Sequence, residues 1–138
     1  MKKRLVVAAV SGAAALLAMS AQASASKVKA PLEEAAGCAV SAKPGVSVGT
    51  AKLTRVGEAV TVKVVMKAGL PNSEYGFALQ RKFPDGHCEG LEIGFFMTNK
   101  KGKGKATVTV NRPLSETEFV LAVLTLGALD TSPLISLP

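Results

Sequence analysis

Alternation of apolar and polar residues is the strongest signal in the chain, and it is clearest between Ala59 and Lys82. From position 60 to position 66 every second side chain is apolar, whereas Thr61 and Lys63 occupy the other parity. After a Gly-Leu-Pro-Asn corner the alternation resumes at Tyr75, Phe77 and Leu79. A two-residue period is typical of half-buried antiparallel strands, so this stretch predicts two strands joined by a loop.

Further strands are predicted on both sides of this stretch, at Val46–Val56, Leu91–Thr98, Lys105–Val110, Phe119–Leu126 and, as a short edge strand, Leu134–Pro138. The phase of the first run slips near Gly49, which predicts a bulge there. In the predicted strand Leu91–Thr98 the apolar face consists of Leu91, Ile93, Phe95 and Met97. Pro31–Gly37 is predicted as one or two helical turns, because proline suits a first helical turn and glycine can end it.

Short strands recur at intervals of roughly 10–15 residues with turn-forming residues between them, and strong helical periodicity is absent after the first 25 residues. Such a pattern favours two packed layers of strands over an open or α/β fold. We therefore predict an all-β fold, a small antiparallel β-sandwich, in a single domain spanning residues 26–138.

The first 25 residues are predicted to be a secretory signal peptide helix. Basic residues at positions 2–4 precede an uncharged apolar stretch, Leu5–Met19, and small-x-small cleavage sites end at Ala23 and Ala25. The alternative is an uncleaved anchor, but the stretch is shorter than the roughly 20 residues of a membrane span. The domain is thus expected in the extracellular space, the periplasm or the cell envelope, with cleavage after Ala23 or Ala25.

Two cysteines, Cys38 and Cys88, follow the leader. An even count in an exported chain predicts one disulfide bond. The bond would close a loop of 50 residues, to which the chain-entropy model assigns about 4 kcal/mol. The alternative is a reactive or metal-bound thiol pair, but the chain lacks CxxC spacing and has a single histidine.

Charge changes the picture only modestly. The chain of 138 residues carries +7, but three of its 17 basic residues and none of its 10 acidic residues lie in the leader, which leaves +4. That balance is not typical of a dedicated nucleic-acid binder. No aromatic side chain interleaves with the lysines, as a stacking platform for single strands requires. We predict no nucleic-acid partner.

The densest positive charge lies in the segment NKKGKGK, whose candidate binding residues are Lys100, Lys101, Lys103 and Lys105. Gly102 and Gly104 separate these lysines, so the segment is expected to be a flexible hairpin tip. One interpretation is attraction to an anionic cell-surface polymer or to lipid headgroups. The other is a solvated tip whose lysines discourage edge-to-edge pairing.

Catalytic constellations are not evident. His87 is the only histidine, so a multi-histidine zinc site is excluded, and Cys88 is assigned to the disulfide. Glu89 and Glu92 are three residues apart, which places them on opposite faces of a strand. No serine or cysteine nucleophile has an evident histidine partner. We predict no catalytic residue, no metal site and no cofactor.

The segment Gly69–Gln80, GLPNSEYGFALQ, resembles the strand entry of secreted copper–zinc superoxide dismutase-like sandwiches. In that family a Gly-Phe pair precedes alternating histidines that bind copper, whereas Ala78 and Gln80 occupy those positions here. The resemblance therefore implies the sandwich and not the metal chemistry. With Thr98-Asn99 and Gly102–Ala106 the same segment also resembles small immunoglobulin-like secreted domains such as the enediyne-antibiotic apoproteins. Both resemblances imply a sandwich of immunoglobulin-like or superoxide dismutase-like topology.

These observations predict a binding or structural module and not an enzyme, with Lys100–Lys105 as its first candidate contact. The alternative is a carrier of a small apolar ligand in a groove between the sheets, near Phe95, Phe96 and Phe119. The second face of the strand Phe119–Leu126 needs a cover. The chain termini or a second copy, in a homo-oligomer, could supply it.

Overall fold

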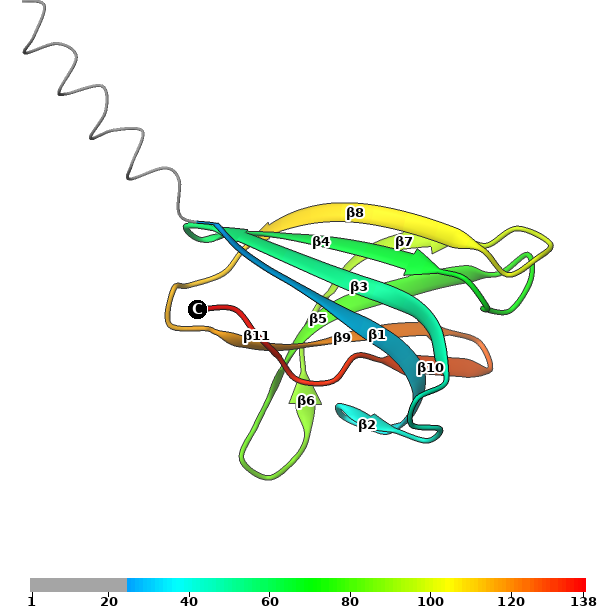
Figure 1. Cartoon of the computed structure of the whole chain (residues 1–138), viewed down its shortest axis with the longest axis horizontal. Coiled ribbons are helices and arrows are strands. Elements are labelled where there is room, and N and C mark those ends of the chain that lie inside the picture. Colours follow the sequence, from blue (N-terminus) through cyan, green and yellow to red (C-terminus); the bar gives the residue numbers. More distant parts are fainter. Residues whose placement is uncertain (1–24) are drawn as a thin grey trace, which may run out of the picture.

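The computed structural model describes residues 25–138, which form one antiparallel sheet that curls strongly on itself (Figure 1). The prediction of an all-β fold is confirmed. The predicted signal peptide lies outside the described residues. No helix in the described part of the chain is long and apolar enough to cross a membrane.

The strands are β1 (Ser26–Gly37), β2 (Val40–Ser41), β3 (Ser47–Val56), β4 (Ala59–Met66), β5 (Glu74–Lys82), β6 (Cys88–Glu89), β7 (Glu92–Met97), β8 (Gly104–Asn111), β9 (Glu118–Thr125), β10 (Ala128–Thr131) and β11 (Ile135–Ser136). Their order across the sheet is β6-β5-β9-β10-β1-β3-β4-β8. Three short or outer strands pair beside this path: β7 with β5, β2 with β1 and β11 with β9.

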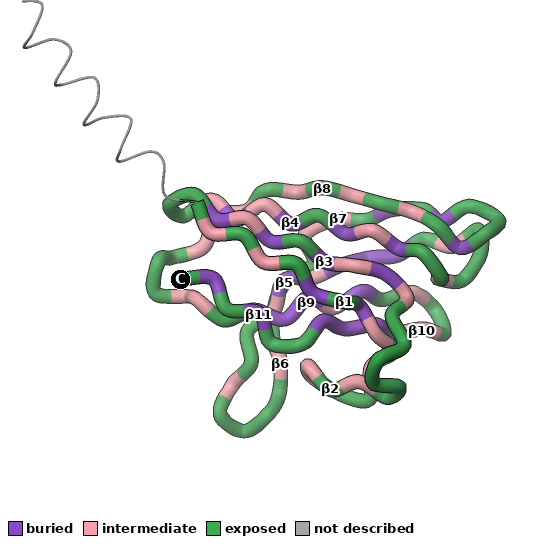
Figure 2. Tube along the Cα trace, viewed as in Figure 1, coloured by how far each residue is buried: buried purple, intermediate pink, exposed green. Residues whose placement is uncertain are grey.

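The two halves of the curled sheet face each other and enclose the core. β1, β3, β4 and β8 form one half, β5, β7 and β9 form the other, and buried positions line the space between them (Figure 2). Two separate sheets were predicted, whereas here β10 pairs with β9 on one side and with β1 on the other. One continuous hydrogen-bonded sheet therefore supplies both layers.

The stretch with the clearest alternation forms the centre of this core. Val60, Val62 and Val64 of β4 are fully buried, as predicted, and Tyr75, Phe77 and Leu79 of β5 face them from the other half. A two-residue turn joins β3 to β4, since Val56 pairs with Ala59. Its first residue, Gly57, has a φ of 59°, the left-handed conformation that such hairpin turns require.

The irregularity predicted near Gly49 is present. The pairing of β1 with β3 shifts between Leu32 and Glu33, opposite Gly49 and Ser47, so that Val48 is the extra residue. A Cβ on Gly49 would lie 2.3 Å from the carbonyl oxygen of Val65. Glycine is therefore required here by the close approach of two backbones.

The predicted helical turn at Pro31–Gly37 is wrong, because these residues are the second half of β1. Leu32 is fully buried in the core, and Pro31 pairs opposite Thr50 of β3. β10 pairs with β1 only at Glu33 and Glu34. On the edge of β1 that faces away from β3, no strand pairs with Pro31, so the missing N–H of proline costs no hydrogen bond there. Proline is tolerated at such a position of a sheet, and tertiary pairing overrides the weak helical signal.

The predicted apolar face of β7 is wrong for Leu91, Phe95 and Met97, which are exposed, whereas Ile93 packs against the core as predicted. Phe96 is 7 % exposed and stacks on Tyr75 at 5.4 Å between ring centroids, whereas Phe95 and Met97 are 60 % and 59 % exposed. The pairing of β5 with β7 shifts between Phe77 and Ala78, so the expected alternation is reversed beyond Ile93. Gly94 points inward and leaves room for the ring of Phe77. Because glycine has no side chain, the sequence did not show that this position belongs to the buried face.

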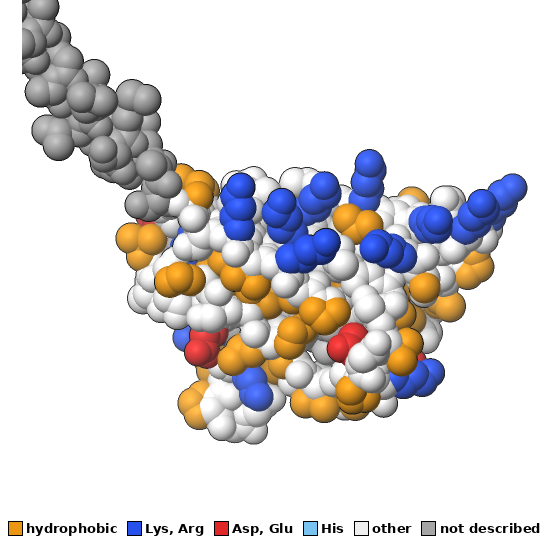
Figure 3. Space-filling model, in the orientation of Figure 1, with side chains coloured by type: hydrophobic (Ala, Val, Ile, Leu, Met, Phe, Trp, Pro, Cys, Tyr) orange, Lys and Arg blue, Asp and Glu red, His pale blue; other side chains and the backbone are white. Residues whose placement is uncertain are grey.

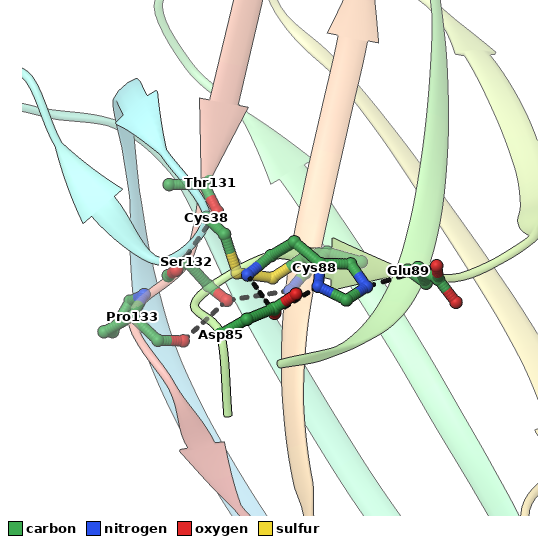
Figure 4. Close-up of a disulfide and its surroundings, with 9 residues drawn as sticks. Cys38, Asp85, Cys88, Glu89, Thr131, Ser132 and Pro133 are labelled. Atoms are coloured by element: carbon green, nitrogen blue, oxygen red, sulfur yellow. Dashed lines mark hydrogen bonds and ion pairs between the residues drawn. A yellow bond between two sulfur atoms is a disulfide. The ribbon is translucent and has the colours of Figure 1, made fainter. Parts of the chain in front are cut away.

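The disulfide between Cys38 and Cys88 is confirmed, with a Cα–Cα distance of 5.6 Å. It joins the turn between β1 and β2 to β6, at the outer end of the sheet path. Ser132 lies beside the bond (Figure 4). Its hydroxyl accepts the N–H of Leu121 at 2.9 Å, and its own N–H donates to the carbonyl oxygen of Leu121 at 3.0 Å. These contacts continue the pairing of β9 beyond the end of β10.

The second face of β9 is only partly covered within one chain. Val120 is fully buried and Ala122 is half-buried, whereas Leu124 and Leu126 are 56 % and 98 % exposed. Cover by a second copy stays a prediction for the two exposed leucines.

Replacing both cysteines, Cys38→Ser with Cys88→Ser, is expected to lower the free energy of unfolding by about 2–4 kcal/mol, because a 50-residue loop is released in the unfolded chain. Urea unfolding followed by circular dichroism measures this change. Wild-type protein in reductant is the matched control and should lose the same amount. An unchanged urea midpoint in both samples would show that the bond does not stabilise the fold.

Candidate functional site

Lysines line the outer surface of the half formed by β1, β3, β4 and β8 (Figure 3). Their apolar neighbours in each strand point into the core, so strand alternation directs the lysines to solvent. We call the following exposed residues the lysine face: Lys27, Lys29, Lys52, Lys63 and Lys105. β3, β4 and β8 contain no acidic residue, and the two glutamates of β1 lie at its far end.

Three of these lysines stand in one row across the sheet. Lys29 pairs opposite Lys52, and Lys52 pairs opposite Lys63. Adjacent strands lie about 4.8 Å apart, so the three stems are parallel neighbours. Like charges directly opposite each other destabilise a sheet by roughly 0.2–1 kcal/mol per pair. The row therefore concentrates positive charge, and a bound anion would reduce the repulsion among the three lysines.

Threonines fill most of the remaining outer positions. Lys27 is followed across the sheet by Thr54, Thr61 and Thr109. The hydroxyls of Thr61 and Thr109 are 2.9 Å apart and hydrogen-bond each other. Hydroxyls and ammonium groups both donate to anionic oxygens, so the face offers donors over its whole breadth.

Two hollows on this surface share the half-buried Val65. One, of about 240 Å³, is lined by Lys29, Thr50, Lys52, Lys63 and Val65. The other, of about 420 Å³, is lined by Val65, Met66, Lys67, Lys103, Gly104 and Lys105. Each hollow combines an apolar floor with a rim of three lysines, an arrangement that suits an anionic headgroup with attached carbon.

The loop with the predicted lysines is a defined turn. The side-chain oxygen of Asn99 accepts the N–H groups of Lys101 and Lys103 at 2.8 and 3.1 Å. Gly102 has a φ of 76°, and its carbonyl oxygen accepts the N–H of Gly69 at 2.9 Å. The predicted hairpin tip is thus a hydrogen-bonded turn. The glycines satisfy turn geometry and a close backbone approach, and they hold the lysines in place.

The loop and the lysine face are continuous, because Lys105 belongs to both and Lys103 rims the larger hollow. Sequence reasoning found the loop lysines, which are close together in the chain, and missed the contribution of the strands. The alternation in the sequence already placed Lys52 and Lys63 on the polar side of their strands. That these lysines form one face with those of β1 and β8 follows only from the strand order β1-β3-β4-β8.

His87 lies on the exposed turn that follows β5 and stacks on Phe83 at 4.7 Å. Its Nδ1 contacts the carboxylate of Asp85, and its Nε2 is 3.2 Å from Glu89 Oε1. The hydrogen bond to Asp85 chiefly raises the pKa of His87. The backbone N–H of His87, which donates to Asp85 at 3.1 Å, and secondarily the imidazole ring lower the pKa of Asp85. Both ring nitrogens face carboxylates, an arrangement that favours the protonated imidazole.

A hollow of about 990 Å³ forms a groove at the open seam between β7 and the end of β8. Leu91, Ile93 and Val110 form its apolar wall. Arg112 donates to the carbonyl oxygen of Leu79 at 2.8 Å and lies 3.5 Å from Glu116, so the positive charge in the groove is already matched.

The aromatic residues considered for an apolar ligand do not share one cavity. Phe96 and Phe119 are buried in the core, and Phe95 points outward on β7. No group of three or more His, Cys, Asp or Glu residues within positions 25–138 is arranged to hold a metal ion. Comparisons of the chain with protein-family models, curated proteins and solved structures found no match.

One carboxylate is buried near the lysine-bearing half. Asp130 of β10 is 5 % exposed and pairs opposite Glu34 of β1. Burial, and secondarily the charge of Glu34, raises the pKa of Asp130 to about 6. Because the folded chain binds this proton more tightly than the unfolded chain, Asp130 favours folding below pH 4 and opposes it increasingly as the pH rises to 6.

Replacing Lys52, the middle of the row, by threonine is expected to stabilise the fold by about 0.5–1 kcal/mol at low salt, because two like-charge neighbours are relieved. Urea unfolding in 20 mM and 1 M NaCl measures the change. The gain should shrink in 1 M salt, where the Debye length is about 3 Å. Lys82→Thr is the control, and an equal gain there would contradict the repulsive row.

The Asp130→Asn variant is expected to remove part of the pH dependence of stability. Between pH 4 and pH 7 the wild type should lose about 1–2 kcal/mol relative to the variant, after allowance for partial solvation. Urea midpoints at half-unit pH steps measure the difference between the two curves. Parallel curves would show that Asp130 titrates normally in the folded chain.

Proposed function

We propose that this chain is an exported, non-enzymatic β-domain that binds surfaces rich in phosphate or carboxylate groups through its lysine face and the adjoining loop, Lys100–Lys105. The observation that carries the proposal is the row of Lys29, Lys52 and Lys63. β3 and β4 contain no acidic residue, and the two glutamates of β1, Glu33 and Glu34, come four and five residues after Lys29. Anionic cell-surface polymers and lipid headgroups both have the chemistry that such a face attracts.

The breadth of the face supports a surface as the partner. The lysines are distributed over four strands and a loop, and the two hollows among them are open and shallow. A small ligand would require converging groups in an enclosed pocket. Many parallel donors on a flat sheet suit a partner with repeated charges, each of which contributes modestly.

The compartment supports the same proposal. The disulfide between Cys38 and Cys88 indicates an oxidising environment outside the cytoplasm. With the predicted signal peptide, it leads us to infer export to the cell envelope or beyond, where anionic polymers and lipids are abundant. In this proposal the turn with His87 is a surface turn, and the disulfide stabilises the fold.

The alternative, a carrier of an apolar ligand, has less support. Phe96 and Phe119, two of the three aromatic residues named for it, are packed core residues. The groove at the open seam has an apolar wall, but two arginines and three glutamates also line it, and both arginines form ion pairs with Glu116. The immunoglobulin-like or superoxide dismutase-like topology also stays a hypothesis, which the continuous curled sheet supports only in its two facing layers.

Neutralising two lysines of the row, Lys52→Gln with Lys63→Gln, is expected to weaken binding to vesicles of three parts phosphatidylcholine and one part phosphatidylglycerol about 10–30-fold. Each lysine near an anionic surface contributes about 1 kcal/mol. Co-sedimentation in 50 mM NaCl measures the dissociation constant. Soluble polyphosphate, measured by calorimetry, tests the same face without lipid.

The charge-matched control is Lys43→Gln with Lys82→Gln, which removes two lysines outside the face. It should bind almost as tightly as the wild type. Equal losses in the two double variants would reduce the proposal to an effect of net charge. If the wild type binds neither probe in 50 mM NaCl, the proposed function is wrong.

A further inference from the structure

A hollow of about 360 Å³ opens between the two halves of the curled sheet, beside the loop from β4 to β5 and the turn from β9 to β10, on the right in Figure 1. β1, β3, β5 and β10 each contribute residues to its lining. Its apolar walls include Val48, Leu70, Ala128 and Leu129. The volume is in the range of small-molecule sites, and no residue of the lysine face lines it.

Asp130 of β10 faces this hollow from an inward position of the sheet. It pairs opposite Val123 of β9, and Val123 pairs opposite Phe77 of β5. Val123 and Phe77 are both fully buried in the core. Residues directly opposite each other share one face of a sheet, so the carboxylate points to the interior. Asp130 is 5 % exposed and lines the hollow.

The carboxylate of Asp130 has no partner among residues 25–138. Burial and the charge of Glu34 act on its pKa, and no hydrogen bond contributes. Polar groups that are buried in proteins are normally hydrogen-bonded, and buried charges are normally paired. Asp130 is therefore an unmatched acceptor that a donor from outside the chain could satisfy.

Two further oxygen-bearing side chains line the same hollow. Glu34 of β1 pairs directly opposite Asp130. Lys43 lies 3.0 Å from the carboxylate of Glu34, so one of the two negative charges is balanced. The hydroxyl of Tyr75 accepts the N–H of Leu70 at 2.9 Å, and its oxygen keeps a second lone pair. The hollow thus combines three acceptor groups, one unmatched negative charge and apolar walls.

This combination suits an ammonium group better than a metal ion. Calcium takes about six to eight oxygen ligands, and magnesium requires near-ideal octahedral geometry. No group of three or more His, Cys, Asp or Glu residues in the described chain is arranged to hold a metal ion. An alkylammonium donates three hydrogen bonds, and the apolar walls can receive its carbon stem.

We propose that this hollow binds a primary ammonium group on a short aliphatic stem, with Asp130 as its ion-pair partner and Glu34 and Tyr75 as further acceptors. Free amines and exposed lysine side chains share this chemistry. The inference goes beyond the proposed function, because the hollow lies apart from the lysine face and takes a ligand of the opposite charge.

Titration with n-butylamine at pH 7.5 tests the site, and butan-1-ol is the uncharged probe of the same length. Nuclear magnetic resonance should show shifts at the amides of Leu70 and of residues 127–130, with a dissociation constant in roughly the millimolar range. Butan-1-ol should bind about tenfold more weakly, because it forms no ion pair.

An acetyl-Gly-Lys-Gly-amide peptide distinguishes the two sources of the ammonium group. Shifts at the same amides would extend the site to lysine side chains of a protein partner. Shifts with n-butylamine but not with the peptide would limit it to free amines.

Asp130→Asn is the decisive variant, because it keeps the shape of the side chain and removes the charge. The fold should tolerate it, since the buried carboxylate opposes folding at pH 7.5. The variant should bind n-butylamine about tenfold more weakly and butan-1-ol as the wild type does. Glu58→Gln is the charge-matched control in the exposed turn between β3 and β4, at the opposite end of the sheet, and should bind as the wild type does.

The pH dependence of binding is a second readout. Glu34, Tyr75 and Asp130 are the titratable side chains that line the hollow, and Lys43 lies beside Glu34. Because the pKa of Asp130 is about 6, the affinity of the wild type for n-butylamine should fall between pH 7.5 and pH 5. The weaker binding of Asp130→Asn should change less over this range.

Four results would overturn the inference. They are the absence of shifts with n-butylamine, equal affinity for n-butylamine and butan-1-ol, unchanged n-butylamine binding in Asp130→Asn, and an equal loss in Glu58→Gln. The third would remove Asp130 from the site, and the fourth would reduce the binding to an effect of net charge. None of them concerns binding to vesicles or polyphosphate, so the inference and the proposed function can fail separately.

Discussion

The two-residue periodicity of β4 is the constraint on which the rest of the structure depends. Burial of Val60, Val62 and Val64 places Lys63 outside, and β3 and β8 follow because they pair with β4 in register. A slip of one residue would bury Lys63 and expose the valines. Burial of each valine stabilises the fold by about 1.5–3 kcal/mol. A like-charge pair destabilises it by only roughly 0.2–1 kcal/mol. Core packing therefore imposes the lysine row.

The ends of the curled sheet are held by polar contacts. Arg55 is 4 % exposed, and its guanidinium donates to the carbonyl oxygens of Gly57, Arg112, Pro113 and Glu116. It thereby joins β3 to the connection between β8 and β9. Near the opposite end Thr98 Oγ1 donates to the carbonyl oxygen of Leu70 at 2.5 Å and accepts the N–H of Ser73 at 2.9 Å. These hydrogen bonds connect the loops at both ends of the sheet to one another or to the strands beside them.

The sequence predicted the disulfide and the strands β3, β4, β5, β7, β8, β9 and β11, because cysteine count and alternation are local signals. It did not predict β1, β2, β6 or β10 as strands. It failed where a long-range contact decided the outcome. Pro31–Gly37 is a strand because β3 and β10 pair with it, and Phe96 is inside because Gly94 accommodates Phe77. The lysine face depends on strand order, which local patterns do not contain. Only its contiguous part, Lys100–Lys105, was visible in the sequence.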